Sequence, residues 1–171
     1  MPRKEWKTGR AAALALLVCG SVAALAPAHA QDTPPDYRDD RSTPQSLVES
    51  LYNAIERGEY LRAWSYLRDE PDRPGFEAFA KGYEGTRHVR VKVAEGISDG
   101  AAGSIYYTVP TVVEAVGTRG TEVFRGCYTL RLVQPAAQLE PPYQPLGIVK
   151  GTLEKTDASF DAAEGVCPEA G

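Results

Sequence analysis

Residues 104–133 read SIYYTVPTVVEAVGTRGTEVFRGCYTLRLV, and this stretch decides the fold. Ser104–Val116 is rich in β-branched and aromatic residues and is apolar on both faces for much of its length, which predicts a central strand covered on both sides. Gly117–Gly120 predicts a hairpin turn, and Thr121–Val133 alternates apolar with polar residues, like a strand that buries one face. Pro110 interrupts the first run, and we expect a bulge or a bend there.

The alternation in the second strand of this hairpin predicts which side chains lie on each face of the sheet. The inner set is predicted to be Phe124, Tyr128, Leu130 and Leu132, and the outer set Arg125, Cys127, Thr129 and Arg131. Arg125 and Arg131 share the outer face, where they could bind an anion or form part of a solvated strand surface.

Three helices are predicted before the strands. Thr43 can cap a helix that starts at Pro44, and Gly58 can end it in a left-handed conformation. The apolar residues of this helix recur at helical spacing and are Leu47, Val48, Leu51, Tyr52 and Ile55. A second helix is predicted from Glu59 to about Arg68, and a third over Gly75–Tyr83.

The remaining strands are shorter or follow loops. Val89, Val91 and Val93 alternate with polar residues and predict a strand, and Ser98–Gly100 predicts a turn. A last strand is expected from about Leu146 to Lys155, after a proline-rich loop. Helices followed by an antiparallel meander make an α+β domain over residues 43–155, with N-terminal helices packed in a curled antiparallel sheet of about four strands.

The first thirty residues have the three parts of a secretory signal peptide. A basic head precedes an apolar run over residues 11–26 and the Ala28-His29-Ala30 cleavage site. The run is shorter than the roughly 20 residues that span a bilayer. We therefore expect cleavage after Ala30, an exported periplasmic or secreted protein, and no stable membrane anchor after signal cleavage. The competing interpretation is a lipid-modified Cys19, which Val18 before it disfavours.

Residues 31–42 are rich in Pro, Asp and Arg and predict a disordered leader. The other two cysteines, Cys127 and Cys167, form an even pair in an oxidising compartment, so we expect one disulfide that ties the C-terminal tail, residues 156–171, to the sheet. Two cysteines and one mature histidine do not make a zinc pattern, and we predict no metal and no cofactor.

The charge balance bears on possible partners. The chain has 19 basic and 23 acidic residues and a formal net charge of −4. Nucleic-acid binding needs clustered Lys and Arg, and here Arg87, Arg90 and Lys92 are dispersed among acidic and apolar residues, so we predict no nucleic-acid partner.

The order of elements resembles the nuclear-transport-factor-like (cystatin-like) cone superfamily, which includes ketosteroid isomerase and scytalone dehydratase. The resemblance rests on the helical pair LYNAIERGEYLRAW, residues 51–64, and on the long strand followed by a hairpin. It implies a cone whose mouth, between helices and sheet, often holds a ligand. Catalytic members place Asp, Tyr or His inside the cone, whereas the predicted strands here contain no Asp and His88 lies on a polar face.

The candidates to line such a pocket are Trp64, Tyr83, Tyr107, Glu114, Phe124 and Tyr128, although for the aromatic ones a role as core and rim residues is the favoured interpretation. The leading hypothesis is a non-enzymatic exported domain that binds a small apolar ligand or an envelope protein. The alternative is a cone-fold isomerase or dehydratase that uses Glu114 and a pocket tyrosine such as Tyr107.

Overall fold

The computed structural model describes residues 33–168. The predicted signal peptide, with Cys19 and the cleavage site after Ala30, lies outside the described residues. No helix in the described part is long and apolar enough to cross a membrane.

The first helix forms as its sequence predicts. Helix α1 spans Pro44–Glu56, and the Thr43 side chain accepts a hydrogen bond from the Ser46 backbone nitrogen at its N-terminus. Gly58 then adopts a φ of 69°, a conformation that glycine allows at little cost. The predicted apolar stripe is fully or almost fully buried, which anchors the helix in the main core.

The second helix is shorter than predicted. Helix α2 covers only Tyr60–Trp64, because the chain that follows joins strand β5, Gly147–Thr156. The Ile148 nitrogen donates to the Tyr66 carbonyl (2.8 Å), and the Arg68 nitrogen donates to the Ile148 carbonyl (2.7 Å). Helix α3, Phe76–Gly82, lies within the range predicted for it.

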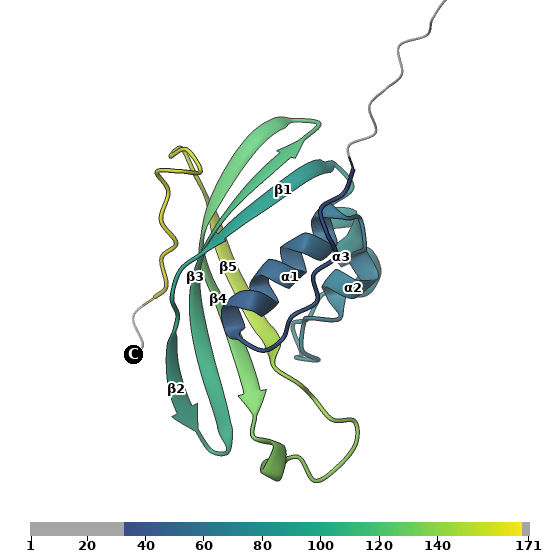
Figure 1. The fold of residues 1–171 in the computed structure, drawn as a ribbon, viewed down its shortest axis with the longest axis vertical. Helices are drawn as coiled ribbons and strands as arrows, with labels where there is room; N and C mark the ends of the chain where they lie inside the picture. The colour runs from purple at the N-terminus through teal and green to yellow at the C-terminus, as the bar shows by residue number, and fades with distance from the viewer. Residues whose placement is uncertain (1–32, 169–171) are drawn as a thin grey trace, which may run out of the picture. The chain divides into compact units, whose positions relative to one another are not determined.

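The sheet is antiparallel and curls around the helices (Figure 1). Its strands are β1 (Thr86–Val93), β2 (Ile97–Ala101), β3 (Ser104–Gly117), β4 (Gly120–Val133) and β5. They are ordered β1-β3-β4-β5. Strand β2 pairs with the same edge of β3 as β1 does, but with the first half of β3. The helices cover the inner face, so the predicted α+β class with a curled sheet is confirmed.

The fifth strand, β2, corrects one prediction. Ser98–Gly100 was expected to be a turn, but these residues pair with Ile105–Tyr107 of β3. The turn lies instead at Ala102 and Gly103, whose φ values are 42° and 77°. Two consecutive positive φ angles are typical of a two-residue hairpin turn, and glycine supplies one of them without strain.

Of the bulge or bend that we predicted at Pro110, the structure shows no bulge in the pairing of β3 with β4. The register between β3 and β4 is continuous across Pro110. On its other side, β1 ends opposite Thr111 and β2 begins opposite Thr108, so Pro110 lies at the gap between them. The Pro110 carbonyl accepts a hydrogen bond from the Ala94 backbone nitrogen in this gap. The backbone nitrogen and carbonyl of one strand residue point to the same neighbouring strand, so the nitrogen of Pro110 also faces the gap. Its missing N–H therefore removes no hydrogen bond between β3 and β4.

The outer face of the sheet carries the C-terminal tail. A small cluster of Val112, Val123 and Ala163, with Ala158 and Phe160 against it, docks the tail by burial. The Lys92 ammonium adds hydrogen bonds to the carbonyls of Phe160, Asp161 and Ala163. The tail therefore has more apolar contact than its sparse hydrophobic residues suggest.

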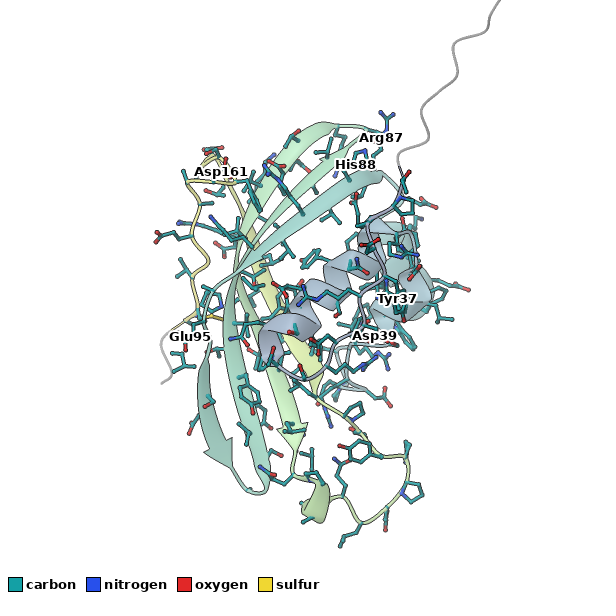
Figure 2. All side chains as sticks on the ribbon, viewed as in Figure 1. Tyr37, Asp39, Arg87, His88, Glu95 and Asp161 are labelled. Atoms are coloured by element: carbon teal, nitrogen blue, oxygen red, sulfur yellow. A yellow bond between two sulfur atoms is a disulfide. The ribbon has the colours of Figure 1, made fainter. Side chains whose placement is uncertain are left out.

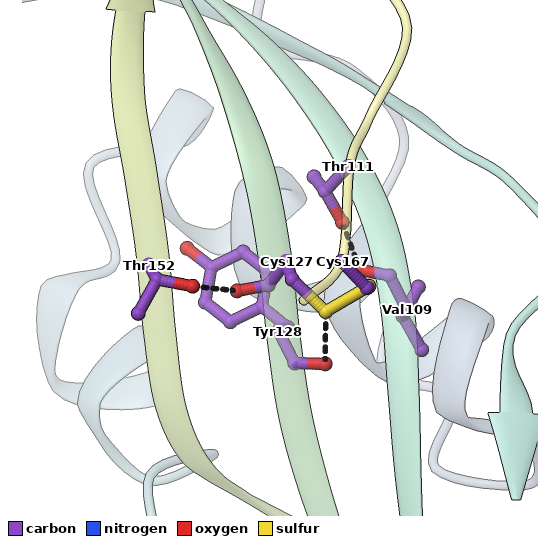
Figure 3. Close-up of a disulfide and its surroundings, with 6 residues drawn as sticks. All are labelled: Val109, Thr111, Cys127, Tyr128, Thr152 and Cys167. Atoms are coloured by element: carbon purple, nitrogen blue, oxygen red, sulfur yellow. Dashed lines mark hydrogen bonds between the residues drawn. A yellow bond between two sulfur atoms is a disulfide. The ribbon is translucent and has the colours of Figure 1, made fainter. Parts of the chain in front are cut away.

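The predicted disulfide is present in this tail (Figure 3). Cys127 and Cys167 are bonded across 40 residues, and Cys127 is 2% exposed on the outer face of β4, as its position in the alternation predicts. The Thr152 hydroxyl donates to the Cys127 carbonyl (3.3 Å), which links β5 to the same point.

The segment before α1 makes contacts that its composition did not predict. It has no helix or strand, yet Tyr37 and Asp39 lie beside the helices (Figure 2). The Tyr66 hydroxyl donates to Asp39 (2.8 Å), and the Arg62 guanidinium donates to the Arg38 carbonyl (2.6 Å). Hydrogen bonds that involve charged side chains and the backbone attach this segment to the helices. Its low apolar content alone therefore does not determine whether it packs against the domain.

Candidate functional site

A pocket of about 330 Å³ lies between the helices and the inner face of the sheet. We call it the inner pocket. Its apolar and aromatic wall consists of Tyr52, Tyr83, Val89, Val113, Phe124 and Leu153, and its polar lining includes Thr86, Arg119 and Glu122. A mainly apolar wall with few polar groups is typical of small-molecule sites.

Two of the six predicted residues line this pocket, and a third, Tyr128, contacts a residue that lines it. Tyr83 and Phe124 line it directly. Tyr128 is buried beneath it, with its hydroxyl 2.7 Å from that of Tyr52. Phe124 and Tyr128 come from the inner face of β4, as the alternation predicts, and Tyr83 follows the end of α3.

The Tyr52–Tyr128 hydroxyl pair is the most distinctive polar feature of the site. Tyr52 is 4% exposed and Tyr128 is 7% exposed, and their rings meet edge to face at 6.2 Å. Burial raises the pKa of both hydroxyls well above the usual value of 10.0. Both groups are therefore protonated at neutral pH and act as hydrogen-bond donors and acceptors rather than as bases.

Tyr83 is held by aromatic neighbours. Its ring stacks on Tyr60 at 6.1 Å and contacts Phe79 at 5.1 Å. Burial raises the pKa of its hydroxyl. These contacts fix the ring as one wall of the pocket.

The rim of the inner pocket carries a carboxylate whose charge is balanced by neighbouring cations. The Glu122 carboxylate accepts from the Lys155 ammonium (3.0 Å) and lies 3.8 Å from the Arg119 guanidinium. The hydrogen bond from Lys155 lowers the pKa of Glu122, so the group is ionised at neutral pH. Because it is a stable carboxylate that already has cationic partners, it is a poor proton donor.

Trp64 does not reach the inner pocket. Its indole nitrogen donates to the Pro74 carbonyl (2.9 Å), and the Arg73 guanidinium stacks over its ring at 3.4 Å. Phe76 meets the ring edge at 6.1 Å. Trp64 thus fixes the connection between α2 and α3.

Glu114 and Tyr107 lie on opposite faces of β3. Tyr107 packs against the main core on the inner face. Glu114 is opposite Val123 on the outer face and forms an ion pair with Arg90 (2.6 Å). The two residues therefore cannot share one site, so the alternative enzyme cannot use Glu114 together with Tyr107.

His88 is an exposed residue near the start of β1 (Figure 2) and is not among the residues that line the inner pocket. Its Nδ1 atom is 3.1 Å from Glu56, whose other oxygen accepts from the Val89 backbone nitrogen. This contact links β1 to the end of α1. Within residues 33–168, no group of three His, Cys, Asp or Glu side chains could hold a metal ion.

Tyr52 is the site residue that the sequence did not single out. It appeared only as one member of the apolar stripe of α1, and its partner Tyr128 is 76 residues away. A tyrosine within a buried helical stripe is a usable signal, because its hydroxyl needs a hydrogen-bond partner there.

Comparison with known proteins gives structural neighbours only. No protein-family model and no curated protein matches the chain. A proposed scytalone dehydratase from Novosphingobium aromaticivorans has a TM-score of 0.49 and 11% identity, over 73% of this chain and 89% of that one. A protein of unknown function from Mycobacterium tuberculosis has a TM-score of 0.46 and 15% identity, over 68% and 76%.

A third neighbour is a proposed dehydratase of the NTF2-like family from Streptomyces avermitilis. Its TM-score is 0.41 and its identity 13%, over 68% of this chain and all of that one. None of these similarities transfers an activity, because fold and chemistry are separable. Within residues 33–168, three helices pack against a curled, unclosed five-stranded antiparallel sheet, an α+β architecture consistent with the cone that the sequence resemblance implied.

Proposed function

We propose that the protein is an exported, non-enzymatic domain that binds a small, mainly apolar ligand carrying one hydrogen-bond acceptor, such as a ketone carbonyl. The observation that carries this proposal is the Tyr52–Tyr128 hydroxyl pair at the wall of the inner pocket. The disulfide between Cys127 and Cys167 is compatible with an oxidising compartment and supports export.

The number of hydroxyl protons in the Tyr52–Tyr128 pair supports a hydrogen-bond acceptor on the ligand. Two hydroxyls carry two protons, and the 2.7 Å bond between them uses one. The described residues provide no acceptor for the other. Tyr52 lines the pocket, so when Tyr128 donates to Tyr52, the Tyr52 hydroxyl can donate to a ligand.

The size and lining of the pocket define the rest of the ligand. A volume of about 330 Å³ is near the lower end of small-molecule pockets, which run from about 300 to 1,000 Å³. Aromatic and aliphatic side chains form most of the wall. A compact ring compound with little charge fits this environment better than a long chain or an anion.

The chemistry of the lining favours binding over catalysis. Glu122 is the one carboxylate among the described lining residues, and it is paired with Lys155 and Arg119 at the rim. The buried tyrosines are protonated and cannot act as bases. The carboxylate of the site is therefore a weak base, because its two cationic partners stabilise its ionised form.

Native mass spectrometry of the protein purified from its own envelope tests this proposal. We expect the wild type to carry a neutral small molecule, and Phe124→Trp, which fills the pocket, to lose it. Lys150→Gln, an exposed change on β5, serves as the control and should keep the molecule. A wild type with no adduct, or one whose only added mass is another protein, would contradict the proposal.

A further inference from the structure

A second concave site lies at the other end of β4 from the inner pocket. It has a volume of about 600 Å³ and is formed by the start of the segment after α2, the end of β4 and the loop before β5. We call it the terminal hollow. Arg68 and Arg131 both line it, and it shares no lining residue with the inner pocket.

The Arg68 side chain is buried, and its Nε–H has no acceptor within hydrogen-bond distance among the described residues. Its side chain is 7% exposed, and its stem crosses Gly147, where a Cβ atom would lie 2.7 Å from the Arg68 Cγ. The terminal nitrogens donate to the Pro145 carbonyl and the Gln144 side chain. The buried Nε has no hydrogen-bond partner among the described residues, and Glu70 is 3.7 Å away. A buried donor whose nearest acceptor is a carboxylate beyond hydrogen-bond distance is costly, so a closer anion would stabilise the Arg68 guanidinium.

Arg131 supplies a second cation to the same hollow. Its Nε donates to the Ser104 hydroxyl (3.1 Å), and its guanidinium lies 5.5 Å from the centre of the Tyr106 ring. The pKa of Arg68 is lowered by burial and by the charge of Arg131, so the two guanidinium groups repel each other. An anion between them would remove this repulsion.

The local charge selects a monoanion. Glu70 offsets one of the two guanidinium charges, and Asp69 is engaged with Arg73 at 3.7 Å. Glu140 is exposed, where solvent screens its charge. With Arg73 counted as the partner of Asp69, the charges around the hollow balance, so a single carboxylate adds less repulsion than a phosphate dianion would.

The loop wall of the hollow is apolar and fixed. Its apolar lining consists of Val133, Ala137, Leu139 and Pro142, and Leu139 is 89% exposed. The Gln138 side chain donates to the Val133 and Gln144 carbonyls (3.0 Å each) and accepts from the Gln144 nitrogen (2.7 Å). The wall is therefore shaped before any ligand arrives.

We propose that the terminal hollow binds a small organic monocarboxylate, whose carboxylate lies between Arg68 and Arg131 and whose hydrocarbon part covers Leu139. The Arg131 guanidinium donates to the carboxylate oxygens, a charge-assisted arrangement that arginine suits, and the Arg68 guanidinium attracts them by its charge. This site is independent of the ligand proposed for the inner pocket.

NMR titration of the arginine Nε–H signals at constant ionic strength tests the proposal. Hexanoate should shift the Arg68 and Arg131 signals saturably, whereas hexanol should not, and inorganic phosphate should bind more weakly than hexanoate. Arg131→Gln should weaken hexanoate binding by about tenfold or more, the loss expected for one charged hydrogen bond. Arg125→Gln, on the same face of β4, is the matched control and should bind as the wild type does.

Several outcomes would overturn the proposal. These are no saturable shift at Arg68 and Arg131, equal binding of hexanol, tighter binding of phosphate, or an equal loss in Arg125→Gln. Arg131→Lys keeps the positive charge but loses the planar guanidinium, and it should bind hexanoate with an affinity between those of the wild type and Arg131→Gln. This comparison separates a specific hydrogen-bonded contact from electrostatic attraction alone. Tyr52→Phe should leave hexanoate binding unchanged, so the result does not depend on the inner pocket.

Discussion

The Tyr52–Tyr128 pair makes a quantitative prediction about stability. Each single replacement by Phe removes the 2.7 Å hydrogen bond and leaves the other hydroxyl buried without its partner. The loss of the bond and the burial of the orphaned group together cost about 1–3 kcal/mol. Removing both hydroxyls leaves no orphan, so the double variant should cost clearly less than the sum of the single ones.

A double-mutant cycle by urea unfolding measures this effect. We expect a coupling energy of about 1 kcal/mol or more between the two positions, with unchanged m-values. Tyr83→Phe is the control, because it removes a hydroxyl from the same pocket without touching the pair. Additive single effects, or a Tyr128→Phe variant as stable as the wild type, would refute the reasoning.

Three further predictions rest on the structure and a fourth on the sequence of the first thirty residues. Replacing Cys127 and Cys167 by Ser opens a 40-residue link, worth about 4 kcal/mol in the chain-entropy model, so the melting temperature should fall and the tail should become protease-sensitive with the sheet intact. The free energy of unfolding should decrease above about pH 10, because the unfolded tyrosines ionise there while the buried pair, with its raised pKa, stays protonated; the slope should be shallower in the double Phe variant. Glu114→Gln should leave ligand binding unchanged, since its carboxylate pairs with Arg90 on the outer face; a loss of binding would show that our placement is wrong. N-terminal sequencing of the exported protein should start at or near Gln31, and a form that begins at Met1 or at acylated Cys19 would contradict cleavage after Ala30.

The elements that local chemistry determines could be predicted from the sequence. Thr43 and Pro44 define the start of α1, and Gly58 ends its turn, because capping and positive φ depend on a few adjacent residues. Strict alternation in β4 separated Tyr128 from Cys127, and both lie on their predicted faces.

Features that depend on distant contacts could not be predicted in the same way. The end of α2 is determined by pairing of residues 66–68 with Ile148, which no local pattern around Arg68 reveals. The contacts of Arg38 and Asp39 with the helices likewise come from backbone and charged groups across the chain. Propensity gives way to tertiary contacts at such places.

The continuous register at Pro110 decides the relative placement of Tyr107 and Glu114, because a one-residue bulge between them would have put both side chains on one face. Tyr107 and Glu114 are seven residues apart on one strand, and an odd separation in a regular strand places two side chains on opposite faces. The register of β3 with β4 confirms this arrangement. By contrast, the pairing of Tyr52 with Tyr128 joins a helix to a strand and required the structure.

The most direct test of the proposed binding site compares 1-indanone with indane, which has the same rings without the carbonyl. Isothermal titration of the wild type should give saturable 1:1 binding, with 1-indanone about fivefold tighter, as expected for one neutral hydrogen bond of about 1 kcal/mol. Tyr52→Phe should bring 1-indanone to the affinity of indane, whereas Tyr83→Phe should keep the preference. Equal affinity of the two probes in the wild type, or no binding of either, would contradict the account.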